Sequence, residues 1–373
     1  MPSGFSIRPL PRVCKLAICF ALSLCVTACG GPAVDLPAPD ARVPHFDIPA
    51  ENILRFAGDV MLTRGVGRRI REAHDPSLPF RQIAPFLAGA DIAFVNLESP
   101  FSDKGKRTQS GLIFNADPVN VAGLQLAGID VVSTANNHSR DARDYGVAFT
   151  YRWLLAHGIQ PVGSALSPIE AHRGVVIERH GVRFGFLAYT YDQQNGNWHD
   201  IDQRIAVIDI PGMRRDVSEL ARKSDVVIVS MHNGIEYREH PNQSQIGFAH
   251  AAIEAGAKLV IGHHPHVVQP FEWYRQGLIF YSLGNFVFDQ FQRQATQRGE
   301  IAEVRFLGGF IASAQLFPVQ VTQDGPVLVP SGEKETAPGM FRRASIDSTI
   351  PAGDSKGEST LPQTGDDQKP APQ

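Results

Sequence analysis

Short apolar runs rich in β-branched and aromatic residues alternate with helical patterns through the middle of this chain, and this alternation strongly constrains its fold. The runs are apolar throughout, which is typical of strands buried on both faces. Helices between such strands indicate an α/β protein whose sheets lie between helical layers. Strands are expected at residues 53–58, 91–96, 129–134, 183–189, 225–231, 257–262 and 278–283.

Helices are expected between several of these strands, at residues 118–128, 145–158 and 243–256. The last two end in a glycine, where a helix C-cap commonly sits. In folds of this kind, ligands gather beyond the carboxyl ends of the strands. The residues that follow each strand are therefore the place to look for function.

Residues that can bind a metal follow five of the expected strands. These residues are Asp59, Asn96 with Glu98, Asn136 to His138, His232 with Asn233, and the group His263, His264 and His266. Asp192 and Asn285 follow two more strands. A single Asp or Asn in such a place is an ordinary turn former or helix N-cap. Turn chemistry does not explain histidines at three of the same strand ends, so the set favours a metal site.

The types of donor narrow the choice of metal. All four cysteines, Cys14, Cys19, Cys25 and Cys29, lie within the first 29 residues, so thiolate ligands and a disulfide framework are excluded from the rest of the chain. Imidazole, amide and carboxylate donors together suit Zn²⁺, Mn²⁺ or iron, whereas Ca²⁺ prefers oxygen alone. The net charge of −3 gives no support for a nucleic-acid partner.

The N-terminus has the pattern of a secretory leader. Arg8, Arg12 and Lys15 precede an apolar run over 16–26, which is too short for a comfortable membrane-spanning helix. The run ends in VTAC, which resembles a bacterial lipobox, and cleavage there would leave a lipidated Cys29 as the new N-terminus. We therefore expect a lipoprotein signal peptide over 1–29 and a membrane-anchored protein of the cell envelope, on its periplasmic or extracellular face. The alternative is an ordinary signal peptide that leaves a free chain.

Composition divides the remaining chain into three parts. Residues 30–50 are rich in proline and alanine and are expected to form a tether. Residues 51–330 are long enough for one large domain with its own core. Residues 331–373 are rich in Gly, Pro, Ser, Thr and charged residues, with Phe341 as their only aromatic residue. Too few apolar residues are present there to form a core, so a disordered tail is expected.

Six motifs follow one another along the chain: FAGDVML, VNLESP, STANNHSRD, SMHNGIEY, GHHPHVVQP and YSLGNFVFDQ. In this order they resemble the capsule-synthesis protein A family, CapA or PgsA of poly-γ-glutamate synthesis, whose domain is similar to the calcineurin-like metallophosphatases. The resemblance covers nearly all of Ile53 to Asp289. The resemblance implies a metallophosphatase-like αββα sandwich, in which two β-sheets are flanked by helices. It also implies one or two divalent ions of Mn, Zn or Fe.

The resemblance assigns roles to residues of the first five motifs. Asp59 is similar to the first metallophosphatase aspartate, Asn137 to the asparagine that ligates the second metal, and His138 to the acid that protonates the leaving group. His232, His264 and His266 resemble the histidine ligands, and Glu98 stands where the phosphatases have a bridging aspartate. Asn96 is the alternative for that place. His263 is expected to be structural or to support the ligands.

Two departures from the phosphatase pattern affect the metal site. Met61 occupies the position of a histidine ligand two residues after Asp59, so the first metal site loses a ligand. Glu98 has a longer side chain than aspartate, which would alter the ~3.5–4 Å metal spacing of two-metal hydrolases. Both a mononuclear and a dinuclear centre stay open.

Two kinds of function are consistent with these residues. One is a metal-dependent hydrolase or transferase that acts on a phosphoester or on an amide-linked anionic polymer, with His138 as the acid. The other is a non-catalytic assembly or export factor that binds such a polymer within a capsule-synthesis complex in the membrane. The acid beside Asn137 favours catalysis, and the loss of a histidine at Met61 favours binding.

Overall fold

The computed structural model describes residues 50–193 and 201–330. The expected leader, the tether apart from Ala50, and the expected tail lie outside the described residues, so they remain predictions. Within the described part of the chain, every helix is too short or too polar to cross a membrane.

The first sheet has eight strands, four from the N-terminal part of the described chain and four from its C-terminal part. Its order is β14-β13-β12-β1-β2-β3-β4, with β11 paired to β1 on a side branch. Strands β1 to β4 are mutually parallel, whereas β12 to β14 add an antiparallel wing beside β1. The strands are β1 (Glu51–Val60), β2 (Ile92–Leu97), β3 (Val131–Ser133), β4 (Gln160–Val162), β11 (Asn285–Val287), β12 (Arg298–Leu307), β13 (Phe310–Thr322) and β14 (Gly325–Leu328).

The second sheet has six strands in the order β5-β6-β7-β8-β10-β9. Its four central strands are parallel, and an antiparallel strand closes each edge. The strands are β5 (Val175–Arg179), β6 (Val182–Thr190), β7 (Val226–His232), β8 (Leu259–His263), β9 (Val268–Tyr274) and β10 (Gly277–Leu283). Every residue of β7, β8 and β10 is buried, as expected for strands covered on both faces.

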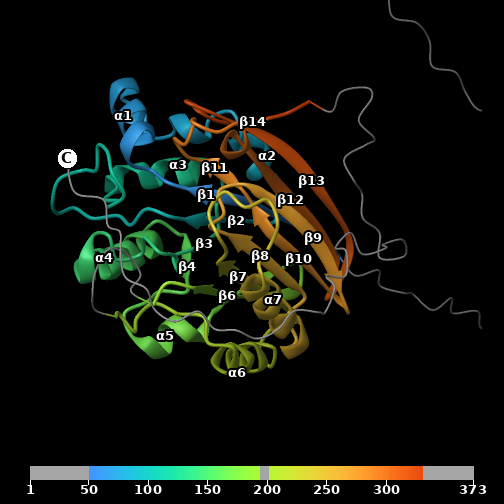
Figure 1. Ribbon diagram of the computed structural model, residues 1–373. Coiled ribbons are helices and arrows are strands. Elements are labelled where there is room, and N and C mark those ends of the chain that lie inside the picture. Colours follow the sequence, from blue (N-terminus) through green and yellow to red (C-terminus); the bar gives the residue numbers. More distant parts are fainter. Residues whose placement is uncertain (1–49, 194–200, 331–373) are drawn as a thin grey trace, which may run out of the picture. The chain divides into compact units, whose positions relative to one another are not determined.

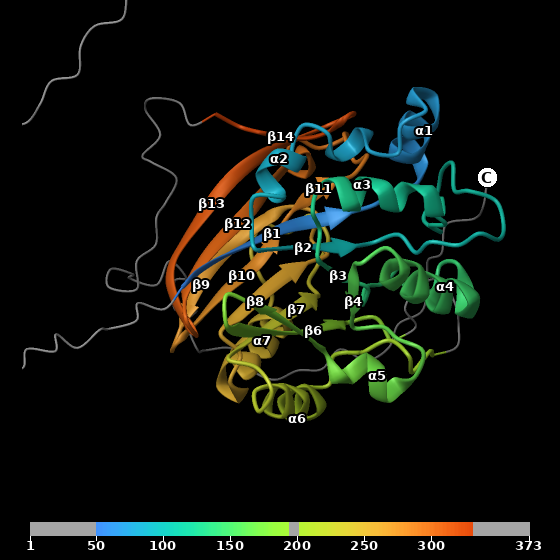
Figure 2. The ribbon, with the colours of Figure 1, turned by 180° about the vertical axis from the view of Figure 1, so that it is seen from behind.

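Helices cover the outer faces of both sheets (Figures 1 and 2). They are α1 (Arg64–Ala73), α2 (Ala84–Leu87), α3 (Val121–Leu126), α4 (Arg143–Ala156), α5 (Pro168–Arg173), α6 (Ile210–Leu220) and α7 (Gln243–Ala255), with 3-10 turns at Leu78–Phe80, Pro118–Asn120 and Ala295–Gln297. Helices α1 to α4 contribute to the core beside the first sheet, and α6 and α7 to the core beside the second.

A third core fills the space between the two sheets. Phe94 of β2 stacks on Phe186 of β6 with ring centroids 6.1 Å apart, and Phe184 meets Phe306 of β12 edge-on at 5.4 Å. Burial of these large rings is worth about 1.5–3 kcal/mol for each side chain. The architecture is therefore the expected αββα sandwich.

All seven strands and all three helices expected from the sequence are present, with ends that differ by a few residues. The helix expected at 118–128 begins as a 3-10 turn, where Asp117 caps Val119 N, and becomes α-helical at Val121. The antiparallel wing was not expected. Many residues of β13 are only partly buried, so that strand lacks the continuous apolar pattern of the central strands.

Candidate metal centre

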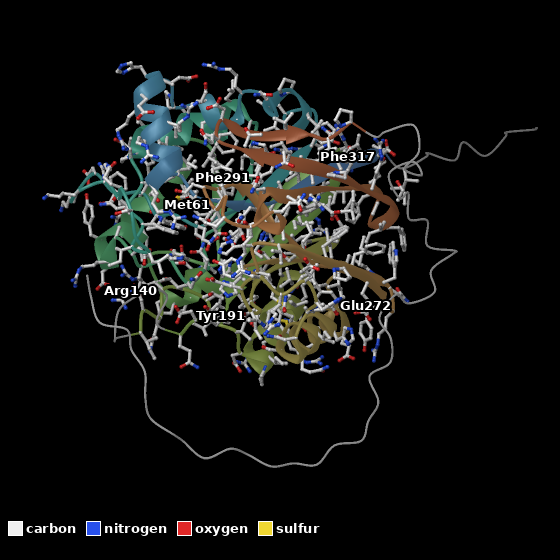
Figure 3. The ribbon with its side chains drawn as sticks, turned by 45° about the horizontal axis from the view of Figure 1, so that its top comes forward. Met61, Arg140, Tyr191, Glu272, Phe291 and Phe317 are labelled. Carbon is white, nitrogen blue, oxygen red and sulfur yellow. The ribbon has the colours of Figure 1, made fainter. Side chains whose placement is uncertain are left out.

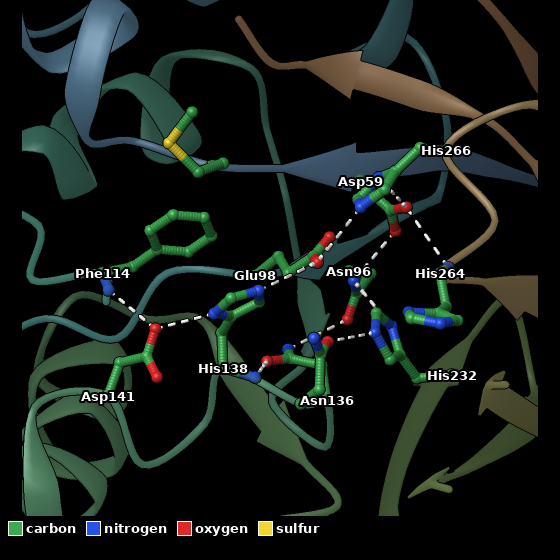
Figure 4. Close-up of polar contacts among 12 residues, drawn as sticks. Asp59, Asn96, Glu98, Phe114, Asn136, His138, Asp141, His232, His264 and His266 are labelled. Atoms are coloured by element: carbon green, nitrogen blue, oxygen red, sulfur yellow. Dashed lines mark hydrogen bonds and ion pairs between the residues drawn. The ribbon is translucent and has the colours of Figure 1, made fainter. Parts of the chain in front are cut away.

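Asp59, Glu98 and His266 meet in a buried cluster at the carboxyl ends of the strands (Figure 4). Asp59 lies near the end of β1, Glu98 follows β2, and His266 follows β8 of the other sheet. One ligand atom from each lies within 4.8 Å of the other two. The αββα arrangement brings them together because β1, β2 and β8 all end at the same side of the sandwich.

Both carboxylate oxygens of Glu98 lack a hydrogen-bond donor among the described residues, although the side chain is completely buried. Burial, partly offset by His266, raises the pKa of Glu98 well above its usual range. A buried carboxylate without a hydrogen bond normally costs free energy of about 1–3 kcal/mol or more. A bound cation would supply the missing partner, so the site fits a divalent metal.

Asp59 is held by four neighbours. Asn96 donates from Nδ2 to Oδ1 at 2.9 Å, and the backbone N–H of His264 donates to Oδ2 at 3.3 Å. The Nδ1 atoms of His263 and His266 lie 3.3 and 3.4 Å from its oxygens. Burial acts to raise the pKa of Asp59, but His263 and His266 outweigh burial and hold it well below its usual range. Asp59 therefore stays ionised, as a metal ligand must.

The ring of His266 joins the two carboxylates. Its Nδ1 faces Asp59 and also lies 3.0 Å from Oδ1 of Asn285, while its Nε2 lies 3.7 Å from Oε1 of Glu98. Burial alone would lower the pKa of His266, but Glu98 and Asp59 raise it to about 9. In the absence of metal, a proton on this ring partly neutralises the two acids.

His232, Asn137 and His264 form a second group beside the first. Nε2 of His232 lies 2.8 Å from Oδ1 of Asn137, and the rings of His232 and His264 are 4.9 Å apart. Burial and the neighbouring histidines lower the pKa of His232 well below its usual value, and burial with His266 lowers that of His264 to about 3. Nδ1 of His264 is buried without a partner among the described residues. Neutral imidazoles are the form that binds metal.

The turn that carries the histidines has an unusual backbone. His264 and His266 have φ angles of 98° and 58°, values that residues with a Cβ rarely adopt. Such conformations cost about 1–3 kcal/mol each and persist only where the surroundings enforce them. The backbone N–H of Tyr237 donates to the carbonyl of Pro265 between them at 2.8 Å. This turn brings both histidine rings to the centre, where His264 lies beside His232 and His266 lies beside Glu98.

His138 lies at the edge of the cluster and is fixed from three sides. Its Nδ1 lies 2.7 Å from Oδ2 of Asp141, which also accepts a bond from the backbone N–H of Phe114 at 2.6 Å. Its ring stacks on Phe114 with centroids 4.0 Å apart. Its Nε2 points at Oε1 of Glu98 from 3.8 Å. A histidine held in this way can present one ring nitrogen to a substrate in the centre.

Asparagines link the two groups of donors. Asn136 donates to Oδ1 of Asn96 at 3.2 Å and to the carbonyl of Leu97 at 2.9 Å, and it accepts from the backbone N–H of His138 at 3.1 Å. Oδ1 of Asn96 therefore accepts a hydrogen bond, whereas neither oxygen of Glu98 accepts one from the described residues. Of the two alternatives for the bridging position, Glu98 has the more available oxygens.

Met61, labelled in Figure 3, follows Asp59 by two residues, and its sulfur is already engaged. The side chain is buried, and Sδ accepts from the backbone N–H and the hydroxyl of Thr63 at 3.1 and 2.8 Å. His263, which is expected to be structural or to support the ligands, faces Asp59 with its Nδ1. Among the described residues, Met61 makes no polar contact with Asp59. Met61 thus offers no imidazole at the position where the resemblance implies a histidine ligand.

All seven residues expected to form the site lie in this region, but their roles as ligands and acid stay predictions. The sequence did not identify Asp141 as the partner of His138, and it indicated Asn136 and Asn285 only as polar residues at strand ends, without a specific role. Asp141 had a usable signal, because it follows His138 by three residues within the same motif. Asn285 is brought to His266 only by the pairing of β11 with β1.

Comparisons with known proteins agree with the motifs. Residues 53–290 match the family model of the bacterial capsule synthesis protein PGA_cap. The chain is 30% identical over 294 residues to the capsule biosynthesis protein CapA of Bacillus anthracis, covering 74% of this chain and 69% of that one. It is also 30% identical over 263 residues to the PGA biosynthesis protein CapA of Bacillus subtilis strain 168, covering 68% of each.

A solved structure, the NAD nucleotidase of Haemophilus influenzae, is similar with a TM-score of 0.45 and 9% identity, over 76% of this chain and 60% of that one. The family assignment depends on the family model and the two Bacillus relatives. The chain belongs to the bacterial capsule synthesis protein family PGA_cap, the CapA family.

Proposed function

We propose that this protein is a metal-dependent hydrolase or transferase of the bacterial cell envelope that acts in the synthesis of a capsule or poly-γ-glutamate-type polymer. The observation that carries the proposal is Glu98, a completely buried carboxylate without a donor, beside Asp59 and His266. The names of the Bacillus relatives support the polymer as context.

The residues of the chain divide between holding a metal and moving a proton. Asp59, Glu98 and His266, with Asn137, His232 and His264 beside them, are the residues that would hold one or two ions of Mn, Zn or Fe. A bound ion would supply Lewis acidity to a phosphoester or amide group. His138 would donate a proton from Nε2 to the leaving group, and Asp141 at 2.7 Å from Nδ1 would keep its ring in the required orientation.

A second candidate function is a non-catalytic assembly or export factor that uses the same centre to bind polymer. Met61 favours it, because the sulfur is engaged by Thr63 and the first site has one histidine fewer than the phosphatases. The two candidates differ in a measurable way, since only the hydrolase turns over a substrate.

The test combines metal analysis with activity. The purified protein, loaded in turn with Mn²⁺, Zn²⁺ and Fe²⁺, is assayed with bis(p-nitrophenyl) phosphate and with γ-glutamyl oligomers. The hydrolase proposal requires bound metal and cleavage that His138→Ala reduces. Bound metal without cleavage of either substrate class would favour the second candidate. Absence of bound metal would exclude both the hydrolase or transferase and a factor that binds polymer through this metal centre.

We also propose that the protein is anchored to the membrane through lipidated Cys29, because VTAC follows a positively charged and then apolar leader. Mass spectrometry of the N-terminal peptide from the native host should find diacylglycerol on Cys29. An unmodified N-terminus at another residue would exclude the anchor.

A further inference from the structure

The chain folds so that a basic surface lies beside the candidate metal centre. Helix α1 carries Arg64, Arg68, Arg69 and Arg71 against a single acid, Glu72, and the loop 102–117 adds Lys104, Lys106 and Arg107 against Asp103 and Asp117. These two segments thus hold seven basic and three acidic side chains, although the whole chain has a net charge of −3. Positive charge is therefore concentrated on α1 and the loop 102–117, although acidic residues outnumber basic ones in the whole chain.

Tertiary contacts join the two segments into one surface. Arg71 donates from Nη2 to Oε1 of Gln109 at 2.7 Å, and the backbone N–H of Arg64 donates to the carbonyl of Thr108 at 3.0 Å. Arg64 also donates from Nη1 to the carbonyl of Gly111 at 3.3 Å. Figures 1 and 2 both show the loop beside the base of α1.

Several cations of this surface are free to bind a partner. Arg71, Lys104 and Lys106 are exposed, and none forms an ion pair with a carboxylate in residues 50–193 or 201–330. Lys104 instead lies 3.7 Å from the centre of the Tyr145 ring. Arg69, Arg107 and Arg64 are paired with Asp324, Asp117 and Asp289 and contribute less charge. We call Arg71, Lys104 and Lys106 the α1 basic surface.

The loop leads from this surface into the centre. Phe114, near its C-terminal end, stacks on His138 at 4.0 Å, and its backbone N–H donates to Asp141. The guanidinium of Arg64 lies over the same Phe114 ring at 4.9 Å and over Phe288 at 5.5 Å. Phe288 in turn packs against His266 with ring centroids 4.8 Å apart. The loop that carries Lys104 and Lys106 therefore reaches the residues expected to perform the chemistry, through the contacts of Phe114 and Arg64.

We propose that the α1 basic surface binds a chain of carboxylates and holds it for the adjacent metal centre, an inference that rests on the proposed function. Separate exposed cations on one surface recognise a flexible polyanion through several weak contacts, which gain from multivalency. Because the loop 102–117 connects this surface to His138, the expected partner is a thin chain that can reach His138, rather than the flat surface of a bilayer.

The test is the binding of poly-γ-glutamate to the full chain, purified in detergent. Arg71→Gln, Lys104→Gln and Lys106→Gln are combined in one variant. Its matched control combines Arg215→Gln, Arg222→Gln and Lys223→Gln, three exposed cations on or just after α6, at the other end of the fold from α1 (Figure 1). The overall change in charge is the same in both variants.

We expect the surface variant to bind poly-γ-glutamate about tenfold more weakly at low salt, while the control binds like wild type. The difference should shrink at about 0.3 M salt because the Debye length shortens. Monomeric glutamate should not bind detectably. Equal weakening in both variants would overturn the proposal, as would wild-type affinity in the surface variant. Binding of single-stranded DNA or anionic vesicles as tightly as the polymer would overturn the polycarboxylate assignment.

Metal content, measured on the same samples, separates this proposal from the proposed function. The surface variant should keep the metal content of wild type. If wild type binds no metal, and the surface variant but not the control binds polymer more weakly, the proposed chemistry is wrong and the proposed binding surface is confirmed. If metal and cleavage of bis(p-nitrophenyl) phosphate are present but polymer binding is unaffected, only the surface fails.

Discussion

Nε2 of His138 lies 3.8 Å from Oε1 of Glu98, in a buried centre where neither oxygen of that carboxylate receives a hydrogen bond from the described residues. A fold selected for stability alone would not keep such a carboxylate without a hydrogen bond, because an unsatisfied buried group costs free energy. The relationship pairs a group that needs a cation with a ring that can carry a proton.

Glu98→Gln should remove the charge on which metal binding depends while keeping the shape of the side chain. Wild type should gain about 2.7 kcal/mol in its free energy of unfolding when free metal is 100 times its Kd, and the variant should gain much less. Thermal melts with and without Mn²⁺, together with metal analysis, measure this. Glu178→Gln, at an exposed position, is the control. Equal stabilisation of wild type and Glu98→Gln by metal would exclude Glu98 as a ligand.

His232→Ala and His264→Ala should lower metal content strongly, whereas His138→Ala should leave it near normal and reduce any hydrolytic rate by ~10²–10⁴-fold. Both ligand candidates are buried, so their alanine variants should also lose about 1–3 kcal/mol of stability. His180→Ala serves as the control, because its side chain is 52% exposed. Loss of metal from His138→Ala comparable to that from His264→Ala would show that His138 is itself a ligand.

Asp141→Asn should keep the metal and weaken the action of His138. The amide can still contact Nδ1 of His138 at the 2.7 Å position, but it cannot stabilise a protonated ring as a carboxylate does. We expect about a tenfold or larger fall in hydrolytic rate and a changed pH profile, with normal metal content. A variant whose rate falls only because metal is lost would show that Asp141 supports the fold of the centre, not the proton transfer.

Glu300 should make stability depend on pH. Burial raises its pKa from 4.5 to about 7, beside a cavity of about 520 Å³ that Arg298 and Glu239 also line. The folded protein therefore keeps a proton that the unfolded chain releases. This contribution to stability is full below about pH 4.5 and is lost as pH rises through about 7.

Glu300→Gln should accordingly raise the free energy of unfolding by up to about 3 kcal/mol at about pH 8, with little change at about pH 4. Urea denaturation across this range measures the difference. Glu239→Gln, an exposed side chain on the same cavity, should show no such dependence. A constant effect of Glu300→Gln at every pH would mean that packing, not ionisation, determines it.

The sequence alone located much of the centre, because its signals are local. Asp59, His232, His264 and His266 each lie at or just after the end of a continuous apolar strand, and the carboxyl ends of parallel strands meet at one edge of a sheet. The same patterns predicted seven of the strands, namely β1, β2, β3, β6, β7, β8 and β10, and three of the helices, α3, α4 and α7. The sequence also showed the loss of a ligand at Met61, which needs no three-dimensional information.

Only the tertiary structure decided which atoms are free and which are paired. The sequence assigns Glu98 to the bridging position, with Asn96 as the alternative. In the structure Asn136, from another strand end, donates to the oxygen of Asn96, whereas neither oxygen of Glu98 has a donor among the described residues. Tertiary contacts also determine two other features. They are the left-handed backbone at His264 and His266 and the basic surface formed by α1 and the loop 102–117. Burial, pairing and local charge depend on residues far apart in the chain, so short sequence patterns cannot specify them.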